Sequence, residues 1–128
     1  MKPDMTATPE QMLMTAIEVI RKRAEPPDEA KAREAAEWEL DTEEMEKNPH
    51  MEQIHFAEFD DYILFVSVAK DSTLRRMPPG TPKMSWSIHT MPGNEAITGG
   101  TAATVEQGKR FAEIAYRAMY GIVYRGDA

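Results

Sequence analysis

The first hydrophobic pattern in the chain has helical spacing. One apolar face is formed by Met12, Leu13, Ala16, Ile17 and Ile20, which recur every three to four residues. Thr8, Pro9 and Gln11 follow the order of an N-cap, a proline at the first helical position and a capping-box glutamine. Pro26 and Pro27 stop a helix that precedes them. The pattern predicts a helix from Pro9 to about Ala24.

A second helix is expected from Asp28 to about Lys47, where good helix formers follow an N-cap residue and Asn48-Pro49 ends the pattern. Its narrow apolar seam consists of Ala35, Trp38, Thr42 and Met45. Carboxylates flank this seam on both sides, at Glu34, Glu37, Asp41 and Glu44 and at Glu39, Glu43 and Glu46. Because unpaired buried carboxylates cost several kcal/mol each, we expect this helix to lie on the surface or to project.

From Met51 onwards the pattern becomes alternating and rich in β-branched and aromatic residues, which is typical of strands. Two strands are expected, at 53–59 and 62–69, with a tight turn between them. A third strand at 83–91 places Trp86 on one face and Ser85, Ser87 and His89 on the other, which we expect to be wet. A short fourth strand at 95–98 leads to Gly99-Gly100, a flexible link rather than an anion-binding loop.

A final helix is predicted after this link. Thr104 is its expected N-cap and Gln107 stands at the third helical position, which repeats the capping-box order. Its apolar face consists of Phe111, Ala112, Ala115, Ala118 or Met119, and Ile122. Gly108 lies on the same face, where a glycine allows a helix to approach a sheet closely. We therefore expect this helix to cover the sheet face that carries Trp86.

The elements together predict an α+β fold. We expect a three- or four-stranded antiparallel sheet covered by a C-terminal helix and preceded by an N-terminal helical arm of two helices. The arm would comprise residues 1–49, with the acidic second helix, and the sheet with its helix residues 50–128. The two parts are expected to form one folding unit.

The charge of the chain is concentrated in one segment. Residues 25–47 hold ten acids and three bases, which accounts for the whole net charge of -7. This balance argues against a generally basic nucleic-acid binder, although one long loop carries Lys70, Arg75, Arg76 and Lys83. The chain has no cysteine, and no apolar run approaches the roughly 18 residues that span a bilayer. We expect a soluble, cytoplasmic protein.

Catalytic chemistry has little support in the sequence. The imidazoles are His50, His55 and His89, and none belongs to a spaced metal motif. His55 and His89 would share a face of the sheet only if their strands pair suitably, and we interpret them as polar strand residues. Nucleophile-elbow and phosphate-loop motifs do not occur. We therefore expect a non-enzymatic protein without catalytic residues, metal or cofactor.

Protein–protein interaction or oligomerisation is the function that we favour. The expected partner is a second copy, in a dimer, or another protein that buries the surplus apolar face of the first helix or the seam of the second. The partner-binding residues would be Ala35, Trp38 and Met45 with the carboxylates Glu37, Asp41 and Glu44.

Two alternatives remain open. The carboxylates of 25–47 could mimic nucleic-acid phosphates and inhibit a basic nucleic-acid-processing protein. In composition, although in no matched motif, the chain is similar to small acidic phage proteins without cysteine, anti-CRISPR proteins among them. The other alternative is nucleic-acid binding through Lys70, Arg75, Arg76 and Lys83, which the net charge opposes.

Overall fold

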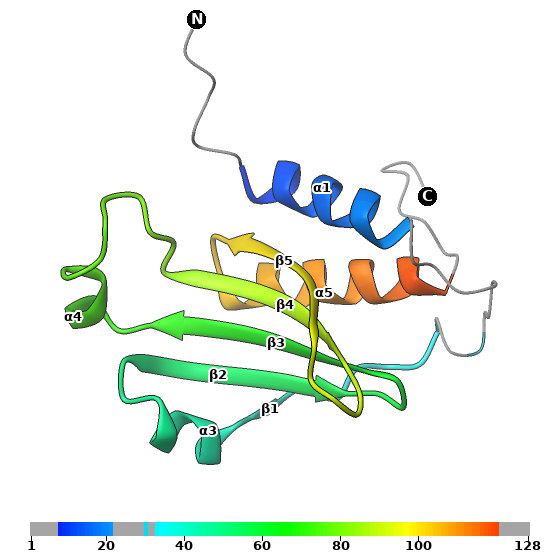
Figure 1. The fold of residues 1–128 in the computed structure, drawn as a ribbon, viewed down its shortest axis with the longest axis horizontal. Coiled ribbons are helices and arrows are strands. Elements are labelled where there is room, and N and C mark those ends of the chain that lie inside the picture. Colours follow the sequence, from blue (N-terminus) through cyan, green and yellow to red (C-terminus); the bar gives the residue numbers. More distant parts are fainter. Residues whose placement is uncertain (1–7, 22–29, 31–32, 121–128) are drawn as a thin grey trace, which may run out of the picture.

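A five-stranded antiparallel sheet organises the part of the chain that the computed structural model describes, residues 8–21, 30 and 33–120. The strands are β1 (Glu39–Leu40), β2 (Met51–Glu58), β3 (Tyr62–Ala69), β4 (Met84–Thr90) and β5 (Ala96–Ala102). Each strand pairs with its neighbour in the chain, so the order in the sheet is β1-β2-β3-β4-β5 (Figure 1). The antiparallel meander is confirmed, with five strands where the sequence predicted three or four.

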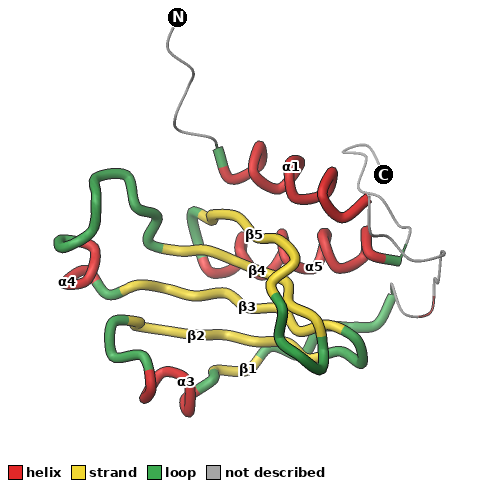
Figure 2. Tube along the Cα trace, in the orientation of Figure 1, coloured by secondary structure: helices red, strands yellow, loops and turns green. Residues whose placement is uncertain are grey.

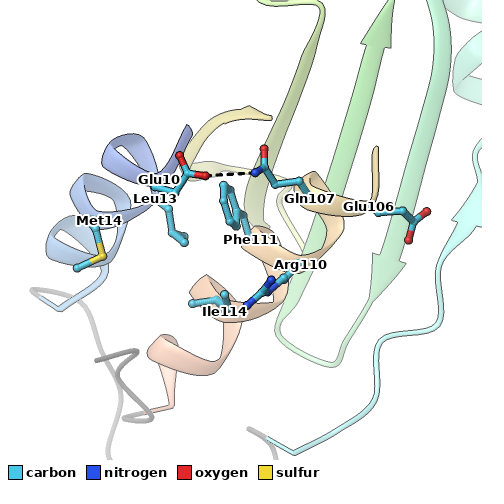
Figure 3. Close-up of a pocket in the computed structure, with 8 residues that line it drawn as sticks. All are labelled: Glu10, Leu13, Met14, Glu106, Gln107, Arg110, Phe111 and Ile114. Carbon is cyan, nitrogen blue, oxygen red and sulfur yellow. Dashed lines mark hydrogen bonds between the residues drawn. The ribbon is translucent and has the colours of Figure 1, made fainter. Parts of the chain in front are cut away.

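Two longer helices lie on the same side of this sheet, as Figures 1 and 2 show. The helices are α1 (Pro9–Arg21), α3 (Thr42–Lys47), α4 (Asp71–Leu74) and α5 (Val105–Met119). α5 packs against β3 and β4, whereas α1 packs against β5 and α5. Across the two helices, Gln107 Nε2 donates to Glu10 Oε1 at 3.3 Å (Figure 3). The α+β class and the covering C-terminal helix are confirmed.

Both longer helices begin where the sequence predicted. At α1 the Thr8 amide donates to Gln11 Oε1 at 2.8 Å and the Gln11 amide donates to Thr8 Oγ1 at 3.1 Å. At α5 the Gln107 amide donates to Thr104 Oγ1 at 3.0 Å. These bonds satisfy amides that have no partner within the helix. α1 ends at Arg21, and residues 22–24 of the expected helix lie outside the described residues.

The predicted helix over 28–47 is wrong. Among the described residues of this segment, Ala30 and α3 are helical, whereas residues 33–41 are not. A continuous helix is therefore absent, and residues 28–29 and 31–32 lie outside the described residues. Glu39 and Leu40 instead pair with Phe56 and His55 of β2 and form β1. Strand pairing gives this backbone the hydrogen bonds that a helix would otherwise provide, so tertiary contacts override the local helix propensity. The seam from Ala35 to Met45 therefore does not exist as a helix face.

The glycine pair near the end of the sheet was also predicted incorrectly. Gly99 and Gly100 lie within β5 and do not form a link after a shorter strand. A Cβ on Gly99 would collide with the backbone oxygen of Trp86, and a Cβ on Gly100 would lie 2.9 Å from Trp86 Nε1. The two glycines are thus needed for close packing of β5 against β4.

The main core lies between the sheet and the helices α1 and α5. Its buried residues include Leu64, Val66, Trp86 and Ile88 from the sheet and Leu13, Ile17, Ile20, Phe111 and Ala115 from the helices. A Cβ on Gly108 would lie 3.1 Å from Val66 Cγ1, so α5 approaches the sheet closely at this point. The expectation that α5 covers the face carrying Trp86 is confirmed.

The two edges of the sheet are both protected. β1 is only two residues long and is followed by the acidic helix α3. Beside β5 lies α1, where Thr101 Oγ1 donates to Met12 Sδ at 3.1 Å. Short edge strands and covering helices both prevent further strands from pairing. The face of the sheet opposite α1 and α5 is then the surface to consider for recognition.

Candidate functional site

The face of the sheet opposite α1 and α5 combines apolar and polar side chains. Directly opposed residues of antiparallel strands share a face. Phe65 of β3 opposes Phe56 of β2 and Ser87 of β4, and Ile63 opposes His89. The polar positions of β4 lie here, as their alternation predicted, but next to apolar positions of β2 and β3. All five of these side chains are half-buried.

A pocket of about 510 Å³ opens on this face. We call it the open-face pocket, and it is lined by Asp41, Glu44, Ile54, Ile63, Phe65, Ser67, Ser87, His89, Met91 and Asn94. The aliphatic and aromatic residues of β2 and β3 form an apolar floor. On the α3 side the pocket is lined by carboxylates, and residues of the turn after β4 complete its lining. An apolar floor with a few polar groups around it is typical of a binding site.

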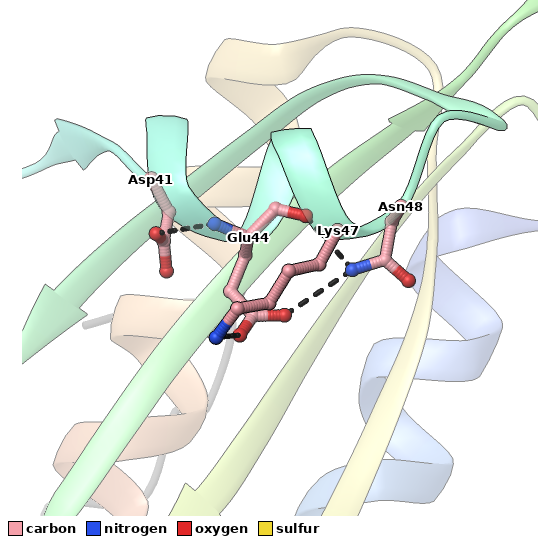
Figure 4. Close-up of polar contacts among 4 residues, drawn as sticks. All are labelled: Asp41, Glu44, Lys47 and Asn48. Carbon is pink, nitrogen blue, oxygen red and sulfur yellow. Dashed lines mark hydrogen bonds and ion pairs between the residues drawn. The ribbon is translucent and has the colours of Figure 1, made fainter.

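The acidic side of the pocket is held in place by the caps of α3 (Figure 4). Asp41 Oδ1 accepts from the Glu44 amide at 3.1 Å, and the Asp41 amide donates to the Ile54 oxygen of β2 at 2.7 Å. Asn48 Nδ2 donates to Glu44 Oε2 at 3.2 Å, and Lys47 Nζ lies 3.8 Å from Glu44 Oε1. Two carboxylates are therefore positioned by α3 beside an apolar floor.

On the opposite side, His89 is oriented by its neighbours. Its ring stands edge-on to Phe65, with centroids 5.0 Å apart. Nδ1 lies 3.4 Å from the Asn94 oxygen and Nε2 lies 3.0 Å from Ser87 Oγ. Because a carbonyl oxygen only accepts, Nδ1 is the donor in that contact, and in the corresponding neutral tautomer Nε2 accepts from the Ser87 hydroxyl.

Ser87 and His89 have the contact of a nucleophile with its base, but their surroundings do not suit acyl transfer. That chemistry needs hydrogen-bond donors aimed at a developing oxyanion. β4 is a central strand, so its backbone amides pair with β3 and β5. The charged residues that line the pocket are Asp41 and Glu44, and carboxylates would destabilise an oxyanion. The arrangement favours binding over hydrolysis.

Metal binding has no support in the described ranges. Within residues 8–21, 30 and 33–120, no three histidine or acidic side chains form a group that could hold a metal ion. His55 opposes Val66 on the helix side of the sheet, whereas His89 lies on the other side. Burial lowers the pKa of His55, and Lys109 lowers it further. His55 and His89, for which a shared face was considered from the sequence, thus lie on opposite faces of the sheet.

The structure separates the predicted partner-binding residues. Asp41 and Glu44 line the open-face pocket. Met45 is half-buried, whereas Ala35 and Glu37 are exposed and line a different hollow beside Phe59. Because these residues do not share a helix, the predicted continuous surface is absent.

Trp38 makes its contacts within the chain. Its Nε1 donates to Glu113 Oε2 of α5 at 3.0 Å, and Lys109 Nζ lies 5.8 Å from the ring centroid. The half-buried indole also packs against the main core. A role for Trp38 in binding a partner stays a prediction, but the geometry provides it with a structural role.

Sequence reasoning missed the apolar floor of the pocket, although a signal for it exists. In β3 the run Tyr62–Val66 is apolar at every position, so both faces of this strand are apolar. A strand of this kind is typical of a sheet that is covered on both sides. The second face of this sheet is only flanked by α3, which leaves Ile63 and Phe65 partly exposed.

The four basic residues predicted on the long loop differ in their surroundings. Lys83 Nζ binds Asp71 Oδ1 at 3.0 Å, a hydrogen bond that raises the pKa of the lysine. Lys70, Arg75 and Arg76 are exposed. The pocket at Arg76 is lined by Pro49, His50, Ser72, Thr73, Arg76 and Met77. His50 is the one aromatic residue in this set, so the pocket offers a single imidazole on which a base could stack.

Comparison of the chain with protein-family models, with curated proteins and with solved structures finds no match. Among the described helices, none has the length and apolar character needed to cross a membrane. The geometry of the open-face pocket is therefore the strongest guide to function.

Proposed function

We propose that this chain is a non-enzymatic protein-binding module whose open-face pocket holds an apolar segment of a partner. The observation that carries the proposal is the position of Phe65. It lies with Ile54 and Ile63 on the floor of a pocket, on the sheet face that α1 and α5 leave uncovered. Recognition sites in proteins commonly have such an apolar centre and a polar rim.

The charge around the pocket indicates the chemistry of the partner. Within residues 33–47 the acids are Glu34, Glu37, Glu39, Asp41, Glu43, Glu44 and Glu46, and the bases are Arg33 and Lys47. Most of these acids are exposed, and Asp41 and Glu44 reach the pocket. A segment that carries lysine or arginine beside its apolar residues would complement both features.

Selection from a random peptide library tests this function. The immobilised full chain should enrich peptides in which an aromatic or aliphatic residue is flanked by lysine or arginine. Phe65→Glu should remove this enrichment because it places a charge on the apolar floor. Met77→Glu is the matched control, since Met77 is an exposed apolar residue outside the pocket. Circular dichroism establishes that both variants are folded.

Two results would contradict the proposal. One is a selection that yields no shared motif, and the other is a motif that Phe65→Glu binds as well as the wild type does. If Phe65→Glu does not fold, Ser67→Glu gives a second test at a position on the pocket wall.

Inhibition by nucleic-acid mimicry is the second candidate, and the exposed acids of residues 33–47 favour it. Binding by charge alone would weaken steeply between 50 and 500 mM salt, because salt screens exposed charges over about 8 Å at physiological ionic strength. Binding centred on Phe65 would depend much less on salt. A selected peptide whose affinity falls steeply with salt and is unaffected by Phe65→Glu would favour mimicry.

A further inference from the structure

A second apolar surface lies in the helical layer, between α1 and α5 (Figure 3). We call it the α1–α5 groove, and its volume is about 440 Å³. Leu13 and Met14 of α1 and Phe111 and Ile114 of α5 provide its apolar lining, and its charged residues are Glu10, Glu106 and Arg110. The groove shares no residue with the open-face pocket, so it does not depend on the function proposed above.

Met14 is an unusual residue for the surface of α1. Its side chain is 48% exposed although it lines the groove. Glu10, Met14 and Arg21 lie within about 40° of one another around the helix, at 3.6 residues per turn. These three residues form a stripe along α1 with an acid at its start, an apolar side chain between and a base at its end.

We propose that the α1–α5 groove is the contact surface between two copies of this chain, with their α1 helices antiparallel. A two-fold axis between Thr15 and Ala16 would place Glu10 opposite Arg21 of the partner subunit. The symmetry produces this ion pair twice, because the same patch serves both copies. A parallel pair would instead bring Glu10 against Glu10 and Arg21 against Arg21.

The charges of the helix termini favour the same arrangement. α1 and α5 run in the same direction, as Figure 1 shows. If α1 of a second copy entered the groove in the opposite direction, it would be antiparallel to both α1 and α5. The positive N-terminal end of each helix would then lie beside a negative C-terminal end. A contact made by 13-residue helices is smaller than a standard interface of about 1,600 Å². We therefore expect a weak dimer, with a Kd on the order of 10 μM.

Sedimentation equilibrium of the full chain tests the surface. From 0.5 to 500 μM the average mass should rise from near 14.5 kDa towards twice that value. Met14→Glu should keep the protein monomeric throughout this range, since it places a charge in the groove. Val19→Glu is the matched control, because Val19 is a 40% exposed apolar residue on α1 that does not line the groove. This control should still dimerise.

Charge reversal tests the antiparallel arrangement separately. Glu10→Arg alone and Arg21→Glu alone should each weaken dimerisation at least tenfold, because each creates repulsion at both ends of the contact. An equimolar mixture of the two variants should associate again, because every base then faces an acid of the other chain. Glu10 also accepts a hydrogen bond from Gln107, and a loss due only to that bond would not be restored by mixing.

Three outcomes would overturn the proposal. A wild-type mass of 14.5 kDa at the highest concentration excludes the dimer. A dimer that tolerates Met14→Glu, or one that Val19→Glu disrupts equally, uses another surface. A mixture of the two charge variants that stays monomeric excludes the antiparallel pairing.

Discussion

The two faces of the sheet are built from the same strands but differ in what covers them. Leu64 and Phe65 are neighbours in β3 and both are apolar, yet Leu64 is 0% exposed beneath α5 whereas Phe65 is half-buried on the open face. On β4 the same alternation separates Trp86 in the core from Ser87 and His89 beside the pocket. The covered face stabilises the fold, and the open face is available for recognition.

Apolar character alone therefore does not assign a residue to the core. The open face retains Ile54, Ile63 and Phe65 although no long helix covers them. A face that only contacts water needs no apolar side chains at these positions. Ser85 and Ser87, on the same face, are polar. Burial therefore has to be measured residue by residue, by the stability that each side chain contributes.

Trp86→Ala is expected to have the largest effect. It removes a buried indole and should lower the free energy of unfolding by about 3–5 kcal/mol, whereas Phe65→Ala should cost about 1 kcal/mol. Urea denaturation followed by circular dichroism measures both. Equal losses would mean that the open face is covered as completely as the helix-covered face.

Trp86→Phe is an informative control for that experiment. Within the described part of the chain, Trp86 Nε1 is a buried polar atom without a hydrogen-bond partner. Phenylalanine would therefore lose packing but no hydrogen bond, and it should retain more stability than alanine does.

Trp38→Ala is expected to have an intermediate effect, because Trp38 lies at the margin of the covered face. It removes the hydrogen bond to Glu113 and part of the packing on the core, and it should cost about 1–2 kcal/mol of stability. Leu40→Ala is the control at an exposed position in the adjacent strand and should change stability by less than about 0.5 kcal/mol.

The sequence-based prediction for Trp38 differs and can be measured on the same variant. It expects Trp38→Ala to weaken association by about 2 kcal/mol with the fold intact. Unchanged stability together with lost association would support that prediction and contradict the structural role of Trp38.

Substitution of His55 should have the smallest effect on stability. We expect this effect to be visible only in how the free energy of unfolding depends on pH. Its pKa is lowered in the folded protein, so the unfolded chain binds its proton more readily. The stability that His55 contributes is fully present above the unfolded pKa of about 6.5 and is lost as the pH falls from there through the lower folded pKa. Between pH 7.5 and 5, wild type should lose more stability than His55→Gln. Parallel curves for the two proteins would contradict the lowered pKa.

The features that depend on nearby residues could be predicted from the sequence. The capping boxes at Thr8 and Thr104 were predictable because each involves residues only three apart. The tight turn after β2 was predictable for the same reason. In this turn the Phe59 amide donates to the Tyr62 oxygen at 2.8 Å. The alternation of β4 likewise predicted which side chains share a face.

The features that depend on distant residues could not be predicted, because they arise from tertiary contacts. The segment 33–41 has good helix formers, but pairing of Glu39 and Leu40 with β2 and the hydrogen bond of Trp38 to Glu113 of α5 keep it non-helical. Gly99 and Gly100 look like a flexible link until Trp86 lies against them. The open-face pocket is lined by residues from α3, β2, β3 and β4, which are distant in the sequence. The α1–α5 groove depends on two helices almost a hundred residues apart, which meet at Glu10 and Gln107. Local propensity contributes a fraction of a kcal/mol per residue, so long-range pairing and burial determine the outcome wherever the two disagree.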